Sequence, residues 1–235
     1  MRAIILAGGK GTRLRPYTTF IPKPLVPIGN EMPILEVIIR QLARCGFTHV
    51  TLTVNHLANL IMSFFGDGAK WNVHIDYSIE DEPLGTVGPL TLIPDLPEDF
   101  LVMNGDILCD LNYQTFFQAH LKHGKRVTVS TYQRDARIDY GVLEWDQEHI
   151  IRKFVEKPTY HFDVSMGIYC FNRAVVTALK KREKYSFDNL ILDGIAANAR
   201  YQAIPFEGFW LDIGRPEDYD YCNENFAEIR KKLDI

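Results

Sequence analysis

The sequence of 235 residues has few cysteines and no apolar segment of membrane-spanning length at its start. The four cysteines, Cys45, Cys109, Cys170 and Cys222, lie far apart and form no CxxC pair, so neither a disulfide framework nor a zinc site is predicted. The apolar run at residues 2 to 6 is too short for a signal peptide or a membrane span. We therefore expect reduced, mostly packed thiols, a cytoplasmic protein and no membrane partner.

A surplus of basic residues is also missing. The chain carries 26 basic and 30 acidic residues, for a net charge of −4, which argues against a general binder of nucleic acids or anionic membranes. The distribution is uneven, because the first 30 residues contain five basic side chains and no acid. The five are Arg2, Lys10, Arg13, Arg15 and Lys23. The rest of the chain carries 21 basic and 30 acidic residues. The basic start of the chain therefore predicts a local patch that attracts anions.

The hydrophobic pattern of the first half predicts alternating strands and helices. We expect strands at 2–6, 50–54, 73–77 and 100–104, with helices at 34–45 and 57–65. Such alternation implies right-handed crossovers and a mainly parallel sheet with helices on both faces. With 46% hydrophobic residues, the chain can bury the core of one large domain, which we place at residues 1–235.

The second half predicts closely spaced strands at 127–132, 140–145, 150–156 and 166–172, without long helices between them. This spacing indicates a small antiparallel extension of the sheet. Helices at 173–182 and 187–199, a strand at 201–206 and a terminal helix from Pro216 follow. The predicted fold class is α/β, with a mixed, mainly parallel central sheet.

The segment AGGKGTRLRP, residues 7 to 16, follows the first predicted strand. In an open parallel sheet, ligands collect at the carboxyl ends of the strands. Glycines let backbone N–H groups approach a phosphate, and the Lys and Arg side chains supply positive charge. The segment lacks the GxxxxGK[ST] spacing, and Leu14 stands where the dinucleotide fingerprint needs Gly. It predicts an anion site, with a flexible surface turn as the alternative.

Three more residues at predicted turns and strand ends extend this site. Pro22 and Pro24 hold Lys23 in a stiff extended backbone. Alone this segment favours a solvated loop lysine, but together with the glycine-rich loop it suggests a phosphate clamp. Asp106 in NGDILCD and Asp212 in FWLDIG each follow an apolar strand, where carboxylates can hold Mg²⁺ together with substrate phosphates. A capping role for Asp106 and a turn role for Asp212 are the alternatives. The combination favours phosphoryl or nucleotidyl transfer.

Eight segments together resemble the sugar-1-phosphate nucleotidyltransferases, also called sugar-nucleotide pyrophosphorylases. They are LAGGKGTRLRPYT, PKPLVPIG, EDEPLGTVGPL, NGD, YGVLE, FVEKP, GIYCFN and WLDIG, in the family's order and spacing over nearly the whole chain. The resemblance implies a Rossmann-like sheet and dependence on Mg²⁺. It also implies attack by a sugar phosphate oxygen on the α-phosphorus of a nucleoside triphosphate, with pyrophosphate leaving.

The resemblance implies roles for the residues at the strand ends. The nucleotide would be bound by Leu6, Ala7, Gly8, Gly9, Gly11, Thr12 and Arg13. Arg13 would stabilise the departing pyrophosphate, Lys23 would bridge the phosphates of the two substrates, and Asp106 with Asp212 would hold magnesium. Arg13, Lys23 and Asp106 form the predicted catalytic set. Because the sugar phosphate supplies the nucleophile, no Ser/His/Asp constellation is needed, and positioning and charge neutralisation supply the rate.

For the base, Glu80, Gly85 and Thr86 match the loop that the family uses. A carboxylate at Glu80 accepts hydrogen bonds from a guanine N1–H and exocyclic amine, or from a cytosine amine, more naturally than it pairs with uracil or thymine. We favour guanine, because the EPLGTVGPL run resembles the mannose-1-phosphate and D-glycero-D-manno-heptose-1-phosphate guanylyltransferases. The same reaction with CTP, UTP or dTTP and another sugar 1-phosphate remains the alternative.

For the sugar, Gly141, Glu156 and Lys157 match the positions where the family contacts hydroxyls and the sugar phosphate. Ser165 and Met166 stand where many relatives have Asn and Ala. Since serine reaches less far than asparagine, the usual hydroxyl contact at Ser165 is expected to be lost, shifted or bridged by water, which leaves room for a heptose.

Two other classes of protein remain open at this point. A metal-dependent glycosyltransferase would also carry an acidic motif after a strand, but it needs neither the GGKGTR loop nor the PKP lysine. A non-catalytic regulator should lack one of Arg13, Lys23, Asp106 or Asp212, and all four are present. The terminal helix favours a closing role in the core, with self-association into a homo-oligomer as the alternative. No nucleic-acid partner is expected.

Overall fold

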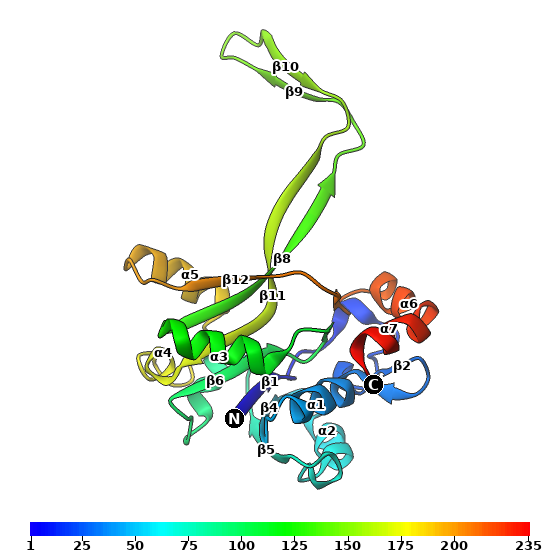
Figure 1. The fold of residues 1–235 in the computed structure, drawn as a ribbon, viewed down its shortest axis with the longest axis vertical. Helices are drawn as coiled ribbons and strands as arrows, with labels where there is room; N and C mark the ends of the chain where they lie inside the picture. The colour runs from blue at the N-terminus through cyan, green and yellow to red at the C-terminus, as the bar shows by residue number, and fades with distance from the viewer.

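The structure is a computed structural model that describes all residues from 1 to 235. Its centre is a seven-stranded sheet with the order β12-β8-β11-β6-β1-β4-β5 (Figure 1). The strands are β1 (Arg2–Leu6), β4 (His49–Val54), β5 (His74–Ile79), β6 (Asp99–Asn104), β8 (Val127–Arg137), β11 (Thr159–Asn172) and β12 (Gln202–Phe206). Only β11 is antiparallel to its neighbours, so the predicted mixed, mainly parallel sheet is confirmed.

Helices cover both faces of this sheet, as predicted. Successive residues of β1 belong to different cores: Ala3 and Ile5 to a cluster of 38 buried residues, Ile4 to a cluster of 13. The larger cluster receives side chains from α1 (Ile34–Arg44), α2 (Ala58–Phe65), α3 (Tyr113–His123), α6 (Pro216–Glu224) and α7 (Phe226–Leu233). The smaller one receives side chains from α4 (Arg173–Thr177) and α5 (Phe187–Ala196). None of the helices is long and apolar enough to cross a membrane.

Helix α1 forms where its apolar spacing predicted it. Leu35, Ile38, Ile39 and Leu42 are fully buried, because positions three and four apart share one helical face. The helix ends before Gly46, whose φ of +78° suits glycine at a helix end.

Short elements connect the larger ones. They are the 3₁₀ helices η1 (Thr12–Leu14), η2 (Lys23–Leu25), η3 (Ala69–Trp71) and η4 (Gly88–Leu92), and the strands β2 (Pro27–Ile28), β3 (Met32–Pro33), β7 (Ile107–Cys109) and β13 (Trp210–Asp212). Strands β7 and β13 pair antiparallel, with Asp212 opposite Ile107. This pairing brings the NGDILCD and FWLDIG segments side by side although they lie about a hundred residues apart in sequence.

The structure corrects three expectations about helices. Helix α3 was not predicted at all, and α4 ends at Thr177 rather than at residue 182. The predicted single terminal helix is two helices, α6 and α7, because the backbone leaves helical geometry at Asn225, whose side chain donates a hydrogen bond to Tyr221 O.

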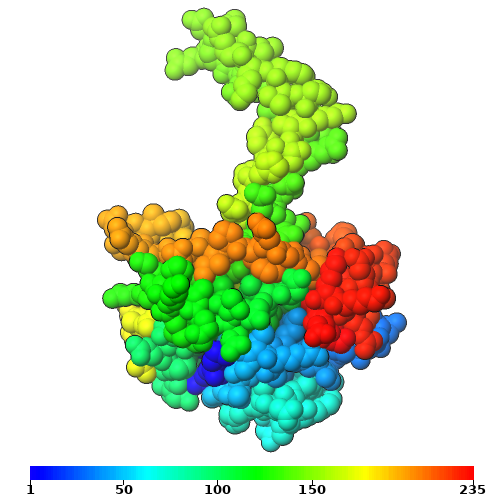
Figure 2. Space-filling model, viewed as in Figure 1, coloured from blue at the N-terminus to red at the C-terminus, as the bar shows by residue number.

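The predicted small antiparallel extension is confirmed, and its outer part leaves the sheet. Strands β8 and β11 pair as a ribbon from Ser165 opposite Thr131 out to Thr159 opposite Arg137. The outer part of this ribbon leaves the body of the molecule, because β6 pairs only with residues 168–172 of β11 and β12 only with residues 128–132 of β8. At its end, β9 (Val142–Trp145) and β10 (Ile151–Val155) pair only with each other. Figures 1 and 2 show residues 133–163, here called the arm, projecting from the body.

Candidate active site

The glycine-rich loop begins where β1 ends. Ala7 N–H donates to Thr53 O at 2.9 Å, which holds the first loop residue against β4. A Cβ built on Gly8 would lie 2.8 Å from Glu80 Oε1, so the glycine lets the chain pass close to the carboxylate in its present position. Gly9 is exposed and a Cβ there would meet nothing, which leaves its backbone open to a ligand.

The end of the loop packs against the PKP segment. Gly11 has a φ of +61°, and a Cβ on it would lie 3.2 Å from Lys23 Cβ. Its carbonyl accepts hydrogen bonds from Thr18 Oγ1 at 2.7 Å and Leu14 N–H at 2.9 Å. The next two loop residues, Thr12 and Arg13, are exposed in η1. The loop and the lysine therefore form one continuous surface.

Lys23 is the first residue of η2 and is only 9% exposed. Its Nζ forms an ion pair with Asp106 Oδ2. The Asp106 carbonyl accepts Ile213 N–H at 3.0 Å, which fixes the residue after Asp212 beside Asp106. The predicted clamp lysine and both predicted metal ligands are thus adjacent.

One oxygen of each aspartate is buried without a partner: Asp106 Oδ1 and Asp212 Oδ1. Burial raises the pKa of the Asp212 carboxyl, the Asp106 charge adds to the increase, and the charges of Lys23 and Arg13 act against it. Buried acceptors without donors cost free energy, which a bound cation would offset.

This donor set fits Mg²⁺, which proteins commonly bind through one or two carboxylates plus substrate phosphates and water. The structure contains no cluster of three or more His, Cys, Asp or Glu side chains that could hold a metal ion. Asp106 and Asp212 are the residues that could hold such an ion.

Arg13 completes this cluster. A Cβ built on Gly214 would lie 3.2 Å from Asp212 Oδ1 and 3.5 Å from both terminal nitrogens of Arg13. The guanidinium and the Asp212 carboxylate therefore converge on the same glycine. The structure brings together Arg13, Lys23, Asp106 and Asp212 from three distant parts of the chain.

Glu80 directly follows β5 and is 7% exposed. Its Oε2 accepts Leu84 N–H at 3.1 Å, and burial raises the pKa of its carboxyl group. Asn55 Nδ2 donates to the Glu80 carbonyl at 2.6 Å. The carboxylate is thus fixed beside Gly8, within the region of the glycine-rich loop.

Gly85 and Thr86, the other residues predicted to contact the base, pack against the start of α5. A Cβ on Gly85 would lie 2.8 Å from Tyr185 O, and Thr86 Oγ1 accepts Phe187 N–H at 2.8 Å. These contacts anchor the 80–86 loop to the helix.

Ser165 lies in a bulge of β11, where the pairing with β8 changes register. Its Oγ accepts Gly167 N–H at 3.3 Å and donates to Tyr169 OH at 3.1 Å. Gly167 has a φ of +75°, and a Cβ on it would lie 2.7 Å from Asn104 Nδ2. The bulge therefore adjoins the end of β6, two residues before Asp106, and the serine hydroxyl is used within it. Met166 beside it is fully buried.

Gly141, Glu156 and Lys157 lie together in the arm, at the junction between the β8–β11 ribbon and the β9–β10 hairpin. A Cβ on Gly141 would lie 3.2 Å from Glu156 Oε2. Ser165 lies eight positions after Lys157 along a largely extended chain, a span of about 26 Å. The structure therefore does not bring these three predicted sugar-phosphate residues to the rest of the site within one chain (Figure 1).

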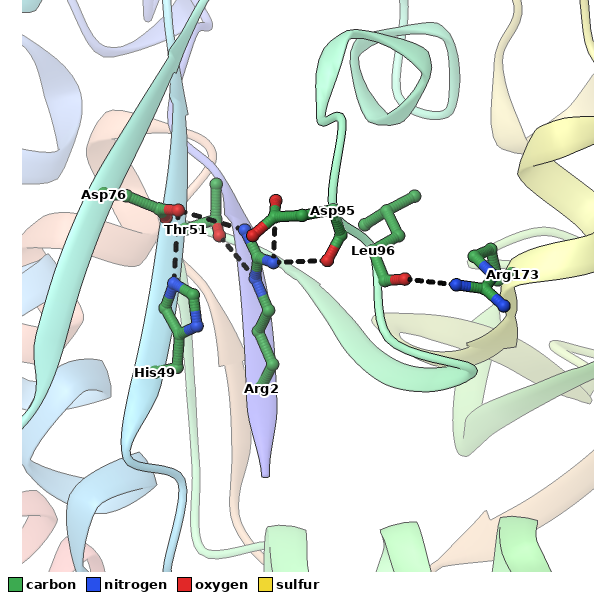
Figure 3. Close-up of polar contacts among 7 residues, drawn as sticks. All are labelled: Arg2, His49, Thr51, Asp76, Asp95, Leu96 and Arg173. Atoms are coloured by element: carbon green, nitrogen blue, oxygen red, sulfur yellow. Dashed lines mark hydrogen bonds and ion pairs between the residues drawn. The ribbon is translucent and has the colours of Figure 1, made fainter.

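Arg2 was counted in the basic patch, and the structure corrects this. It lies at the opposite end of β1 from the glycine-rich loop and is 6% exposed. It donates to Thr51 Oγ1 at 2.9 Å, Asp95 O at 2.9 Å and Asp76 Oδ2 at 3.0 Å (Figure 3). Its charge is paired with the two aspartates and is not available to a substrate.

Sequence reasoning missed three polar or aromatic residues around the site: Asn55, Asn104 and Trp210. Each asparagine is at the carboxyl end of an apolar strand, which was an available signal. Trp210 Nε1 donates to Met166 O at 3.1 Å, and its ring lies 5.2 Å from that of Tyr132 at the base of the arm. Only the fold reveals this last contact.

A sheet whose carboxyl edge carries a glycine-rich basic loop, a buried lysine and paired carboxylates is typical of α/β proteins that act on nucleotides. The chain belongs to the nucleotidyl transferase family, whose sequence model matches residues 2–228.

Curated relatives extend this similarity. Mannose-1-phosphate guanyltransferase beta-A from Xenopus laevis is 37% identical over 227 residues, which cover 93% of this chain and 62% of that protein. A mannose-1-phosphate guanyltransferase from Aspergillus oryzae is 36% identical over 228 residues, with the same shares covered. The chain thus spans less than two thirds of the length of these relatives.

A solved structure, HddC from Yersinia pseudotuberculosis, is 29% identical, with a TM-score of 0.74 over 96% of this chain and 99% of that one. A structure of HddC complexed with GMP-PN is 28% identical, with a TM-score of 0.72. The fold therefore extends over nearly the whole of both chains.

Proposed function

We propose that the protein joins GTP to a sugar 1-phosphate, either mannose 1-phosphate or D-glycero-D-manno-heptose 1-phosphate, and releases pyrophosphate. The observation that carries the proposal is the convergence of Arg13, Lys23, Asp106 and Asp212 beside the glycine-rich loop. In the reaction a sugar phosphate oxygen bonds to the α-phosphorus as the bond from the α-phosphorus to the bridging oxygen breaks. The electron pair of that bond leaves with pyrophosphate.

The residues of the chain act by positioning and by neutralising charge. Lys23, held by Asp106, bridges the phosphates of the two substrates, and Arg13 stabilises the charge that develops on the leaving pyrophosphate. Backbone N–H groups from Gly8 to Thr12 hold the triphosphate. Asp106 and Asp212 would hold Mg²⁺, which when bound neutralises phosphate charge. No protein nucleophile takes part, because the sugar phosphate already carries one.

The choice of guanine rests on Glu80. A carboxylate fixed beside the glycine-rich loop can accept hydrogen bonds from the N1–H and the exocyclic amine of guanine. The names of the relatives and the complex of HddC with GMP-PN support the same base. CTP, UTP or dTTP with another sugar 1-phosphate is the alternative, as is a regulator that binds a nucleotide sugar without catalysis.

The choice of sugar 1-phosphate depends on the surroundings of Ser165. The Ser165 hydroxyl is used within its own bulge, so it offers less to a substrate than the asparagine of many relatives would. We place the reaction in the cytoplasm, where nucleoside triphosphates are available and where the free thiols of the chain stay reduced.

The test is pyrophosphate release with Mg²⁺ across a panel of five nucleoside triphosphates and several hexose and heptose 1-phosphates. GTP with mannose or heptose 1-phosphate should give the highest kcat/KM, and no release with any pair would refute the proposal. Asp106→Asn should lower kcat on the order of 100-fold or more. Asp110→Asn is the matched control in the same motif, because asparagine can still accept Phe209 N–H there, and it should retain activity.

A further inference from the structure

The arm carries a disproportionate share of the exposed apolar surface. Twenty large apolar side chains are exposed in the structure, and ten of them lie between Ile138 and Phe162. Trp145, Ile151 and Phe154, for example, are 60%, 61% and 60% exposed. Such a concentration on one projecting segment marks a surface that another protein covers.

The hairpin at the end of the arm also lacks support from its own chain. Strands β9 and β10 have four and five residues and pair with nothing else. No residue of the arm belongs to either hydrophobic core. An isolated two-stranded hairpin is marginally stable at best in water, so this one needs a further packing partner.

The same segment holds residues that the active site lacks. Gly141, Glu156 and Lys157 are the expected contacts of the sugar phosphate, yet the paired ribbon of β8 and β11 carries them about 26 Å from Ser165. The ribbon is hydrogen-bonded from Ser165 to Thr159, so the arm is one paired unit, and in the structure it projects away from its own site (Figure 1).

We propose that the arm lies over the active site of a second copy of this chain and supplies Glu156 and Lys157 to it. Lys157 would then neutralise the sugar phosphate and Glu156 would accept hydrogen bonds from sugar hydroxyls. A second copy is the occupant because each chain lacks at its own site the residues that its arm presents. A reciprocal two-fold exchange completes both sites and buries both hairpins, whereas an unrelated partner would leave both sites incomplete. This inference rests on the proposed function.

Mixed dimers test the exchange directly. One chain carries Asp106→Asn and an intact arm; the other carries Glu156→Ala with Lys157→Ala and an intact body. If arms are exchanged, the purified mixed dimer has one complete site and shows about half the wild-type kcat, while each parent stays at least about tenfold below it. If every site is completed by its own chain, the mixed dimer is no more active than the parents, which overturns the inference.

A measurement without substrate separates this inference from the proposed function. Light scattering should give twice the 27.0 kDa of the single chain for the wild type. Trp145→Glu, in the hairpin, should shift the protein towards the monomer on dilution. Leu121→Glu, at an exposed apolar position of α3, is the matched control and should stay dimeric.

Failure of the proposed function and failure of the arm exchange give different results. If the wild type is inactive on every substrate pair, the proposed function fails, and the dimer mass with the Trp145→Glu shift still decides whether the arm joins two copies. A monomeric wild type at micromolar concentration, or a Trp145→Glu variant as dimeric as the control, overturns the exchange whatever the activity.

Discussion

Glu80 is a buried carboxylate whose hydrogen-bonding capacity is only partly used within the chain. Burial disfavours its charge, and in the structure one oxygen accepts a single backbone N–H. The other oxygen lies beside Gly8, with acceptor capacity left. Two donors on the edge of guanine would use that capacity, which is the basis proposed for discrimination between bases.

Replacing Glu80 by Gln should therefore relax the base preference. The amide presents a donor where guanine needs an acceptor, so the ratio of kcat/KM for GTP over ATP should fall at least about tenfold. Steady-state kinetics with both nucleotides measure this ratio. The control is Asp81→Asn, which removes an exposed carboxylate from the next position and should leave the ratio unchanged. An unchanged ratio in Glu80→Gln would remove Glu80 from base recognition.

Arg2 and Arg13 test the difference between a structural and a catalytic arginine. Arg2→Met removes hydrogen bonds to Thr51, Asp76 and Asp95, and should lower the free energy of unfolding by about 2 kcal/mol without changing kcat. Arg13→Met should leave stability unchanged and lower kcat at least about 100-fold. Urea unfolding measures the free energy of unfolding of each variant, and initial rates measure its kcat. A loss of activity at full stability in Arg2→Met would contradict the assignment.

At the scale of elements, the sequence predicts those whose burial follows a simple pattern. The strands β1 and β6 are nearly continuous apolar runs because both of their faces are buried, and α1 repeats apolar residues every three to four positions. The apolar spacing does not predict helix α3, because a histidine occupies one of its core positions. His120 is 1% exposed and contacts Thr128 Oγ1 at 2.7 Å and Asp99 Oδ1 at 3.2 Å. A core position that is occupied by a hydrogen-bonded histidine cannot be recognised from hydrophobicity alone.

His120 should make stability depend on pH. Burial lowers the pKa of its imidazole below the ordinary 6.5, although Asp99 acts in the opposite direction. Below 6.5 the unfolded chain therefore binds a proton that the folded chain resists, and the free energy of unfolding falls as the pH falls.

Urea unfolding of the wild type and His120→Gln at about pH 7.5 and about pH 5.5 measures this dependence, and the variant should lose less stability on acidification. His123→Gln, at an exposed histidine of the same helix, should behave like the wild type. An equal loss in His120→Gln and the wild type would exclude the buried histidine as the cause.

At the scale of the molecule, the body and the arm differ in what sequence can predict. Asp106 and the glycine-rich loop follow β6 and β1, two neighbouring parallel strands whose carboxyl ends meet at one edge, so their proximity could be expected before the fold was known. Asp212 joins them through the antiparallel pairing of β13 with β7, and Lys23 through its ion pair with Asp106. The direction of the arm could not be expected. Strand patterns at 140–145 and 150–156 are the same whether a hairpin covers its own sheet or projects from it, because local periodicity carries no information about distant packing.

The separation of body and arm leads to a prediction for the whole molecule. Replacing residues 138–158 with Asn-Gly joins Arg137 and Thr159, which already face each other across the ribbon, through a two-residue turn. No core residue is removed, so the free energy of unfolding should stay within about 1 kcal/mol of that of the Trp145→Glu variant, which also lacks the contact between copies. GTP should still bind in the presence of Mg²⁺, because the glycine-rich loop and Glu80 remain.

Turnover in this shortened chain should fall at least about 100-fold, because no arm supplies Glu156 and Lys157 to any site. Calorimetric titration with GTP and pyrophosphate release measure the two activities separately. Loss of GTP binding would show that the arm supports the nucleotide site as well. Retained turnover would show that the body completes the sugar-phosphate site without the arm, since stability and nucleotide binding in the same sample exclude misfolding as an explanation.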